Sequence, residues 1–137
     1  MLTEPYLFFE GRCEEAVDFY RKHLGAEVGT LMRNKEGPEP HQPGMLPPGS
    51  ENKVMHGVIK IGDSKVMVSD GRCSGKPDFR GFALTLTAPD VARADKLFAA
   101  LADGGQVQMA QAKTFFSPRF GMVTDRFGVL WIIIVMP

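Results

Sequence analysis

Histidine, cysteine and tryptophan are scarce in this chain of 137 residues, which has three, two and one of them. The histidines, at positions 23, 41 and 56, show no HxH or HxxxH spacing, and the two cysteines form no CxxC pair. A catalytic divalent ion needs about three histidine, carboxylate or thiolate ligands that converge on one point. The sequence therefore lacks the usual spacing of a metal site, and we expect no cofactor.

The chain also lacks an excess of charge of one sign. Lysine plus arginine number 16 and aspartate plus glutamate number 16, so the formal net charge is zero. Nucleic-acid and membrane-surface binding depend on basic patches, and neither partner is expected. The longest aliphatic run, 132–136, is too short to span a bilayer. We expect a cytoplasmic protein with no leader segment, in which Cys13 and Cys73 are free thiols.

At this length one domain, 1–137, is expected, and its first half predicts one helix and four strands. The helix covers 13–24, because apolar residues recur there at three- and four-residue spacing. Gly25 follows it as a left-handed cap. Apolar and alternating runs predict the strands, at 5–9, 27–33, 54–61 and 65–69.

The second half repeats the same β-α-β-β-β order. Its helix begins after the N-cap residue Asp90 and stops at Gly104, with an apolar stripe from Val91 to Leu101. Its predicted strands are 82–87, 107–110 and the two arms of a closing hairpin over 114–135. We therefore expect two modules, 1–70 and 81–137, joined by a linker at 71–80.

A proline-rich segment, 34–52, interrupts the first module. It contains five prolines and several glycines, a composition that disfavours a helix or a central strand. Long loops in compact domains are commonly covers or binding elements. We expect a loop that covers a ligand site.

Several short motifs resemble the vicinal oxygen chelate superfamily, which contains glyoxalase I, bleomycin-resistance proteins and extradiol dioxygenases. More narrowly, they resemble its PhnB-like branch, whose members often carry the label 3-demethylubiquinone-9 3-methyltransferase. The resemblance implies an α+β fold in which two β-α-β-β-β modules form curved mixed sheets around a cup, usually in a homodimer. The motifs are Pro5–Phe9, Asp18-Phe19-Tyr20, Leu24-Gly25, Met55-His56-Gly57, Ile61-Gly62-Asp63, Ser69-Asp70 and Thr114–Gly121.

The metal ligands of metal-dependent relatives have no counterpart in this chain. Matching the motifs places those ligand positions at Pro5, at Phe82 and near Ile132, and none of these side chains binds a metal. The resemblance therefore implies a metal-free pocket. One alternative stays open, because a register slip of one or two residues would let His56 and Asp70 approach each other.

Two polar residues are candidates for catalysis. His56 interrupts an apolar strand and is either a general base or ligand donor, or a structural histidine with a satisfied hydrogen bond. Asp70 is either a catalytic carboxylate or a turn residue that bonds nearby backbone amides. Arg119 is expected to contact an anionic ligand group or a second subunit, and Lys113 to be solvated.

The expected ligand pocket has mainly aromatic walls. These residues are core material first, but the strands of a cup place some of them on its inner surface. Apolar walls with few polar groups suit a flat or aromatic small molecule. The expected lining residues are Tyr6, Phe8, Phe82, Phe116, Arg119, Phe120 and Trp131.

Two functions remain open from the sequence. The first is a protein that binds an apolar or aromatic small molecule without a catalytic ion, as bleomycin-resistance proteins do. The second is a glyoxalase-like lyase or isomerase that uses His56 or Asp70 as acid or base, with or without a weakly held divalent metal. A methyltransferase is not supported, because no glycine-rich G-x-G loop follows a predicted strand.

Overall fold

The computed structural model describes residues 1–37 and 46–137. The central part of the predicted loop 34–52 therefore lies outside the described residues. The chain divides into two units, Met1–Pro77 and Asp78–Pro137. No helix among the described residues is long and apolar enough to cross a membrane.

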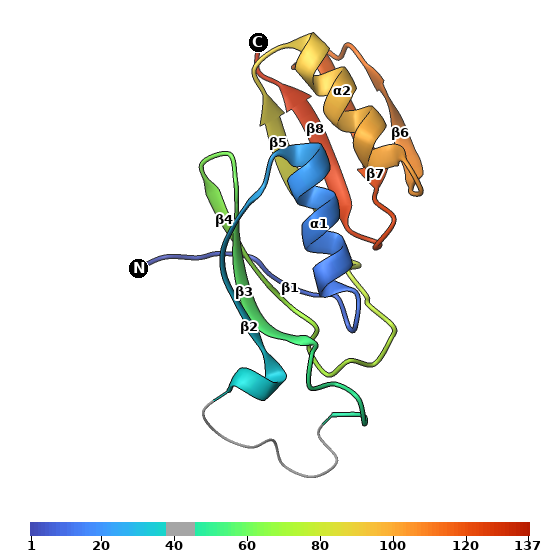
Figure 1. Ribbon diagram of the computed structural model, residues 1–137. Coiled ribbons are helices and arrows are strands. Elements are labelled where there is room, and N and C mark those ends of the chain that lie inside the picture. The colour runs from blue at the N-terminus through green and yellow to red at the C-terminus, as the bar shows by residue number, and fades with distance from the viewer. Residues whose placement is uncertain (38–45) are drawn as a thin grey trace. The chain divides into compact units, whose positions relative to one another are not determined.

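The first unit is one helix against a four-stranded mixed sheet (Figure 1). Its strand order is β1-β4-β3-β2, with β1 parallel to β4 and the other pairs antiparallel. A short 3₁₀ helix, Asn34–Glu36, follows β2, so the expectation of a loop throughout 34–52 was wrong for the residues that precede the first proline. The other elements are β1 (Tyr6–Phe8), α1 (Cys13–Leu24), β2 (Glu27–Arg33), β3 (Val54–Ile61) and β4 (Ser64–Ser69).

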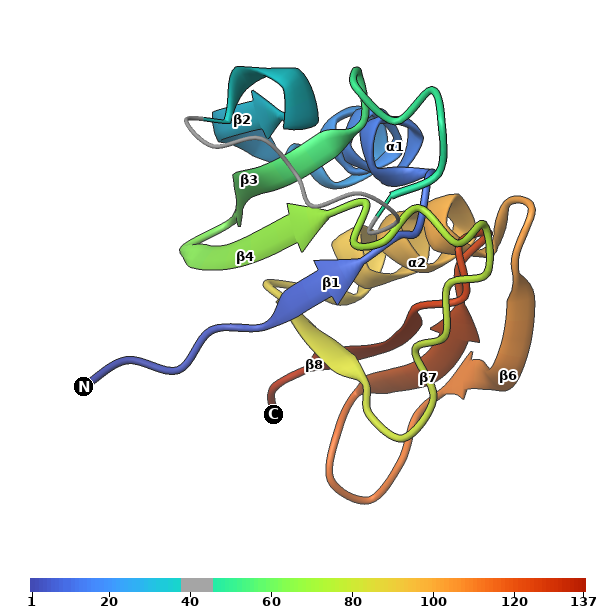
Figure 2. The same ribbon diagram turned by 90° about the horizontal axis from the view of Figure 1, so that it is seen from below.

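The second unit repeats this arrangement with the order β5-β8-β7-β6 (Figure 2). The predicted pair of β-α-β-β-β modules and the α+β class are confirmed. The strand expected at 82–87 begins only at Leu84, which leaves Phe82 in the segment ahead of it. The elements are β5 (Leu84–Ala88), α2 (Val91–Ala102), β6 (Gln106–Ala112), β7 (Arg119–Thr124) and β8 (Leu130–Val135).

A glycine occupies the same place at the centre of each sheet. A Cβ atom on Gly57 of β3 would lie 2.9 Å from Leu31 Cδ1, and one on Gly121 of β7 would lie 2.8 Å from Phe98 Cε2. Both positions need glycine because neighbouring side chains fill that space. The register partners of these glycines are equivalent in the two sheets. In the first sheet Gly57 pairs with Val68, which pairs with Leu7. In the second sheet Gly121 pairs with Ile133, which pairs with Leu86.

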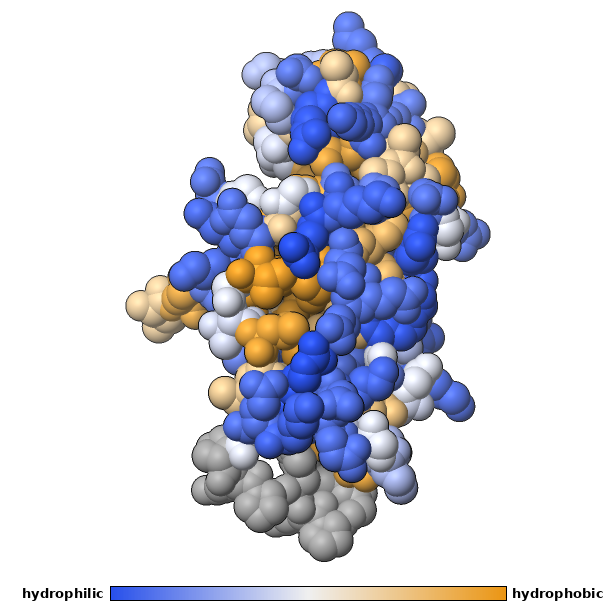
Figure 3. Space-filling view, in the orientation of Figure 1, coloured by the Kyte–Doolittle hydropathy of each residue, from blue (hydrophilic) through white to orange (hydrophobic). Residues whose placement is uncertain are grey.

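Both helices bury most of the apolar stripe that their sequence predicts, and only Val91 at the start of the α2 stripe is half-buried. In α1 the stripe from Cys13 to Leu24 is buried, and its charged side contributes hydrophilic surface (Figure 3). Gly25 ends α1 in the left-handed conformation at φ 68°. Asp90 caps α2 by accepting a hydrogen bond from the Arg93 amide at 2.8 Å, as predicted. The buried residues of α2 are Ala94, Leu97, Phe98 and Leu101.

The two cysteines are free and differ in burial, which predicts different reactivity. Burial, together with the nearby Asp70 charge, raises the pKa of the Cys13 thiol. Partial burial also raises the pKa of the Cys73 thiol, so its reaction should be slow. At about pH 8 the reagent dithiobisnitrobenzoate should still modify the half-exposed Cys73 and leave Cys13 intact, because Cys13 is fully buried and the thiolate is the reacting form. Both should react in denaturant. Rapid modification of two thiols per folded chain would contradict the packing of Cys13.

Candidate functional site

A cavity of about 640 Å³ opens on the second sheet. Its apolar walls include Phe79, Phe82, Met122 and Leu130. This volume lies within the range of small-molecule sites, which are mostly apolar with a few polar groups. The cavity is therefore large enough for a flat ligand of one or two rings.

Strand alternation places three of the lining residues. Val123 of β7 and Trp131 of β8 are buried on the face that α2 covers. Since neighbouring side chains of a strand point to opposite faces, Met122, Thr124 and Leu130 lie on the face turned away from α2. The cavity is built on that face.

The segment before β5 supplies the aromatic wall. Gly81 has φ 91°, a conformation that glycine adopts readily, and it lies between Phe79 and Phe82. The two phenyl rings meet edge to face, with centroids 6.5 Å apart. Phe79 is buried and Phe82 is half exposed. The Phe79 ring is therefore fixed by packing, and the Phe82 ring is available for contact with a ligand.

Few polar groups border the cavity. The Gln108 amide donates from Nε2 to Thr124 Oγ1 at 3.1 Å. The Arg80 guanidinium binds both carboxylate oxygens of Asp78, at 3.0 and 2.9 Å, which raises the pKa of Arg80. Its charge is thus balanced beside the cavity, and the remaining wall favours an apolar or aromatic ligand.

Of the five predicted lining residues in this unit, Phe82 lines the cavity. Trp131 is 2 % exposed and donates from Nε1 to Asp125 Oδ2 at 2.9 Å, which makes it a core residue beneath α2. Phe116 and Phe120 meet each other edge to face at 5.1 Å and are not lining residues of the cavity.

Arg119 is held by the helix of its own unit. Its Nε and Nη2 atoms donate to the two carboxylate oxygens of Asp95 on α2, at 2.9 and 3.0 Å. This pair raises the pKa of Arg119. The structure thus shows a bidentate pair between β7 and α2, and the expected contact of Arg119 with a ligand or a second subunit stays a prediction.

Sequence reasoning missed most of the cavity wall. Phe79, Met122, Thr124 and Leu130 were not among the candidates, although the last three follow the period-two alternation of β7 and β8. That alternation identifies two faces but does not say which of them is covered. Only the position of α2 decides it.

On the first sheet, three candidate residues gather on the face turned away from α1. The Tyr6 hydroxyl lies 2.7 Å from His56 Nδ1, and its ring stacks on Phe8 with centroids 4.7 Å apart. Tyr6 is on β1 and His56 on β3, so the phenol reaches across β4. The buried Leu7, between Tyr6 and Phe8, belongs to the opposite face.

Asp70 has a structural position. It is 1 % exposed, and its Oδ1 accepts from the amides of Gly11 and Cys13 at 2.9 and 2.8 Å. Its Oδ2 accepts from the Val54 amide at 2.7 Å. These amides are distant in the sequence, not nearby as expected. The first turn of α1 lacks a side-chain cap of its own, and Asp70 supplies one.

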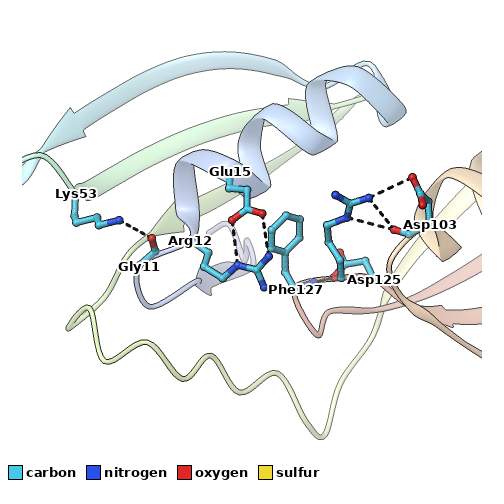
Figure 4. Close-up of polar contacts among 8 residues, drawn as sticks. Gly11, Arg12, Glu15, Lys53, Asp103, Asp125 and Phe127 are labelled. Atoms are coloured by element: carbon cyan, nitrogen blue, oxygen red, sulfur yellow. Dashed lines mark hydrogen bonds and ion pairs between the residues drawn. The ribbon is translucent and has the colours of Figure 1, made fainter.

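Lys53 holds the same turn from another side. Its ammonium group donates to the Gly11 carbonyl at 2.8 Å, while Arg12 and Glu15 pair at 3.0 Å on the surface of α1 (Figure 4). Gly11 therefore has both its amide and its carbonyl bound by side chains.

The three backbone amides bound to the Asp70 carboxylate suit a structural role for this residue and not proton transfer.

Comparison with known proteins identifies the family. Residues 4–133 match the model of the Glyoxalase/Bleomycin resistance protein/Dioxygenase superfamily. The chain belongs to this superfamily. YjdN of Escherichia coli strain K12 is 36% identical over 141 residues, covering 99% of this chain and 96% of that protein. The predicted superfamily is thus confirmed.

Two solved structures of the superfamily fold are similar over nearly the whole chain. PA1353 from Pseudomonas aeruginosa is 35% identical with a TM-score of 0.84, covering 99% of this chain and 98% of that one. A Bacillus cereus PhnB protein, named a putative 3-demethylubiquinone-9 3-methyltransferase, is 25% identical with a TM-score of 0.79, covering 98% and 99%. The predicted PhnB-like resemblance is confirmed.

The described residues do not supply the donor set of a superfamily-type metal. The resemblance places the ligand positions at Pro5, at Phe82 and near Ile132, and the side chains of these three residues offer no donor atom. Within residues 1–37 and 46–137, no group of three His, Cys, Asp or Glu side chains gathers around one point. These residues therefore offer no site at which a chelated ion could take part in a reaction.

The contacts of Asp70 predict a large effect of Asp70→Asn on stability. An asparagine amide has one acceptor oxygen, so either the Val54 amide or the pair from Gly11 and Cys13 would face an NH₂ group. The free energy of unfolding should fall by about 1–3 kcal/mol, measured by urea denaturation. Asp63→Asn, in an exposed turn, is the matched control and should change it little. Equal effects of the two variants would contradict the role of Asp70.

Proposed function

We propose that this protein binds a small, flat, apolar or aromatic molecule in the cavity of its second sheet. The observation that carries the proposal is the cavity of about 640 Å³ with Phe79, Phe82, Met122 and Leu130 in its wall. Transfer of apolar surface from water contributes about 25 cal/mol per Å². A ligand held between aromatic and aliphatic side chains gains most of its affinity in this way.

The chemistry of the wall supports an uncharged ligand. Arg80 is already paired with Asp78, and Gln108 with Thr124. The Arg80–Asp78 pair is exposed to solvent and carries no net charge, so the rest of the wall offers a strongly charged ligand little to replace its hydration, and this loss costs free energy. An aromatic ligand instead continues the edge-to-face packing of Phe79 and Phe82.

The proposal predicts that indole, as a probe, shifts the carbon-13 methyl resonance of Met122 in methionine-labelled protein. Met122→Asn should weaken indole binding about tenfold, roughly 1.4 kcal/mol, because it removes apolar wall. Met136→Asn is the control, since Met136 is an exposed methionine that follows β8, at the opposite end of that strand from the lining residue Leu130. Indole titrations followed by methyl spectra measure both effects.

Three results would contradict the proposed cavity. Indole could leave the Met122 methyl unchanged at millimolar concentration. It could shift Met136 and Met122 equally, as non-specific association does. The two asparagine variants could also weaken binding to the same extent.

A second candidate is a glyoxalase-like lyase or isomerase that uses His56, and the 2.7 Å contact of Tyr6 with His56 Nδ1 favours it. A hydrogen-bonded partner orients an imidazole for proton transfer, which is how acid-base catalysts are commonly held. Asp70 has no part in this candidate, because its oxygens are bound by three backbone amides.

The two candidates predict different results with the hemithioacetal of methylglyoxal and glutathione, assayed with and without added nickel or zinc. The binding proposal predicts no turnover above the uncatalysed rate. The enzyme candidate predicts turnover that is lost in His56→Ala and kept in His23→Ala. His23 lies on α1 against Phe19 and serves as the matched histidine control. Turnover that follows His56 would replace the binding proposal.

A further inference from the structure

The Tyr6–His56 pair is not a requirement of the fold. When Leu7 is matched to Leu86 and Gly57 to Gly121, Thr85 is the counterpart of Tyr6 and Phe120 is the counterpart of His56. The second sheet therefore forms the same framework without a phenol and an imidazole at these positions. A feature present in only one of two equivalent sheets needs a reason beyond the architecture.

The nearest strand neighbours of the pair on this face are uncharged. Met32 on β2 is the register partner of His56, and Val58 lies two residues further along β3. On β4, Met67 and Ser69 are the register partners of Tyr6 and Phe8. Partly burying a hydroxyl and an imidazole among such groups costs free energy unless each polar atom finds a partner. The Tyr6 hydroxyl and His56 Nδ1 satisfy each other, which leaves one polar atom to consider.

That atom is Nε2 of His56. Burial raises the pKa of Tyr6 above its ordinary value, although a hydrogen bond from Ser69 acts in the opposite direction, so the phenol keeps its proton. The 2.7 Å contact allows either atom to donate. With the phenol as the donor, Nδ1 is the acceptor and a neutral imidazole carries its hydrogen on Nε2. In the part of the chain that the structure describes, His56 Nε2 has no hydrogen-bond partner.

Phe8 adds a flat apolar surface beside this donor. It stacks on Tyr6 with an interplanar angle of 8° and is 48% exposed, so one edge of the stack is open to another molecule. An exposed aromatic ring next to a single hydrogen-bond donor matches a planar ligand with one acceptor atom.

We infer that this face of the first sheet binds an uncharged aromatic carbonyl compound. Its oxygen accepts the hydrogen of His56 Nε2, and its ring packs on Phe8. Tyr6 is the positioning residue, because it holds the imidazole in the tautomer that donates. The inference rests on the proposed function in taking the protein as a small-molecule binder, and it concerns a different sheet from the cavity.

The tautomer is tested by long-range proton–nitrogen-15 correlation spectra of the histidine rings at about pH 8.5, where histidine side chains are generally uncharged. We expect Nδ1 of His56 as the unprotonated nitrogen and Nε2 as the protonated one. Tyr6→Phe keeps the stack and removes the hydroxyl, so this preference should be lost. An unprotonated Nε2 in the parent protein would overturn the inference.

The ligand class is tested with acetophenone and its hydrocarbon isostere α-methylstyrene, which differ in the oxygen atom. Acetophenone should bind about three- to tenfold more tightly and shift the His56 Nε2 resonance, as one neutral hydrogen bond allows. Tyr6→Phe should remove that difference, whereas Phe8→Ala should weaken both compounds. Equal affinities in the parent protein would overturn the inference.

Met122→Asn separates this site from the cavity. It should leave the shift of His56 by acetophenone unchanged while it weakens indole binding. Indole binding without a response of His56 to acetophenone would overturn the inference and leave the proposed function standing. A response of His56 to acetophenone without indole binding would contradict the proposed cavity and leave this inference standing.

Discussion

The buried carboxylate of Asp70 is the interaction on which the first unit depends. It binds the amides of Gly11 and Cys13 at the start of α1 and the amide of Val54 at the start of β3. A buried charge is costly without hydrogen bonds, and three short ones from backbone amides beside a helix N-terminus compensate it. Val54 is the first residue of β3, so this side chain also anchors the start of the strand that carries His56.

The second unit uses the same device at another place. Asp125 is buried, and it accepts from the amides of Phe127 and Val129 and from the indole of Trp131. These bonds hold the turn between β7 and β8. Leu130, which lines the cavity, is the first residue of β8 after that turn. In both units, therefore, a buried aspartate anchors the start of one strand that carries a residue proposed to meet a ligand.

Local patterns predicted most of the fold. The helical stripes, the Gly25 terminus and the Asp90 cap involve residues within a few positions of each other, and all of them appear in the structure. The Asp70 cap joins residues 57 positions apart, so no local pattern contains it. The absence of a Ser, Thr, Asp or Asn before Cys13 was the available signal.

The candidate sites were predicted less well than the fold, for the same reason. Tyr6, Phe8 and His56 were identified and do come together, because a polar residue in an apolar strand is conspicuous in a sequence. The cavity wall was missed because its residues are ordinary strand side chains. Trp131 and Arg119 were expected to face a ligand, but the choice of face depends on where α2 packs.

A crystal structure of the protein soaked with indole would decide whether the second sheet holds a small aromatic molecule. Electron density for indole is expected against Phe79, Phe82 and Met122, on the face turned away from α2. Well-ordered crystals with indole density only elsewhere, or with that space filled by side chains, would contradict the proposed cavity.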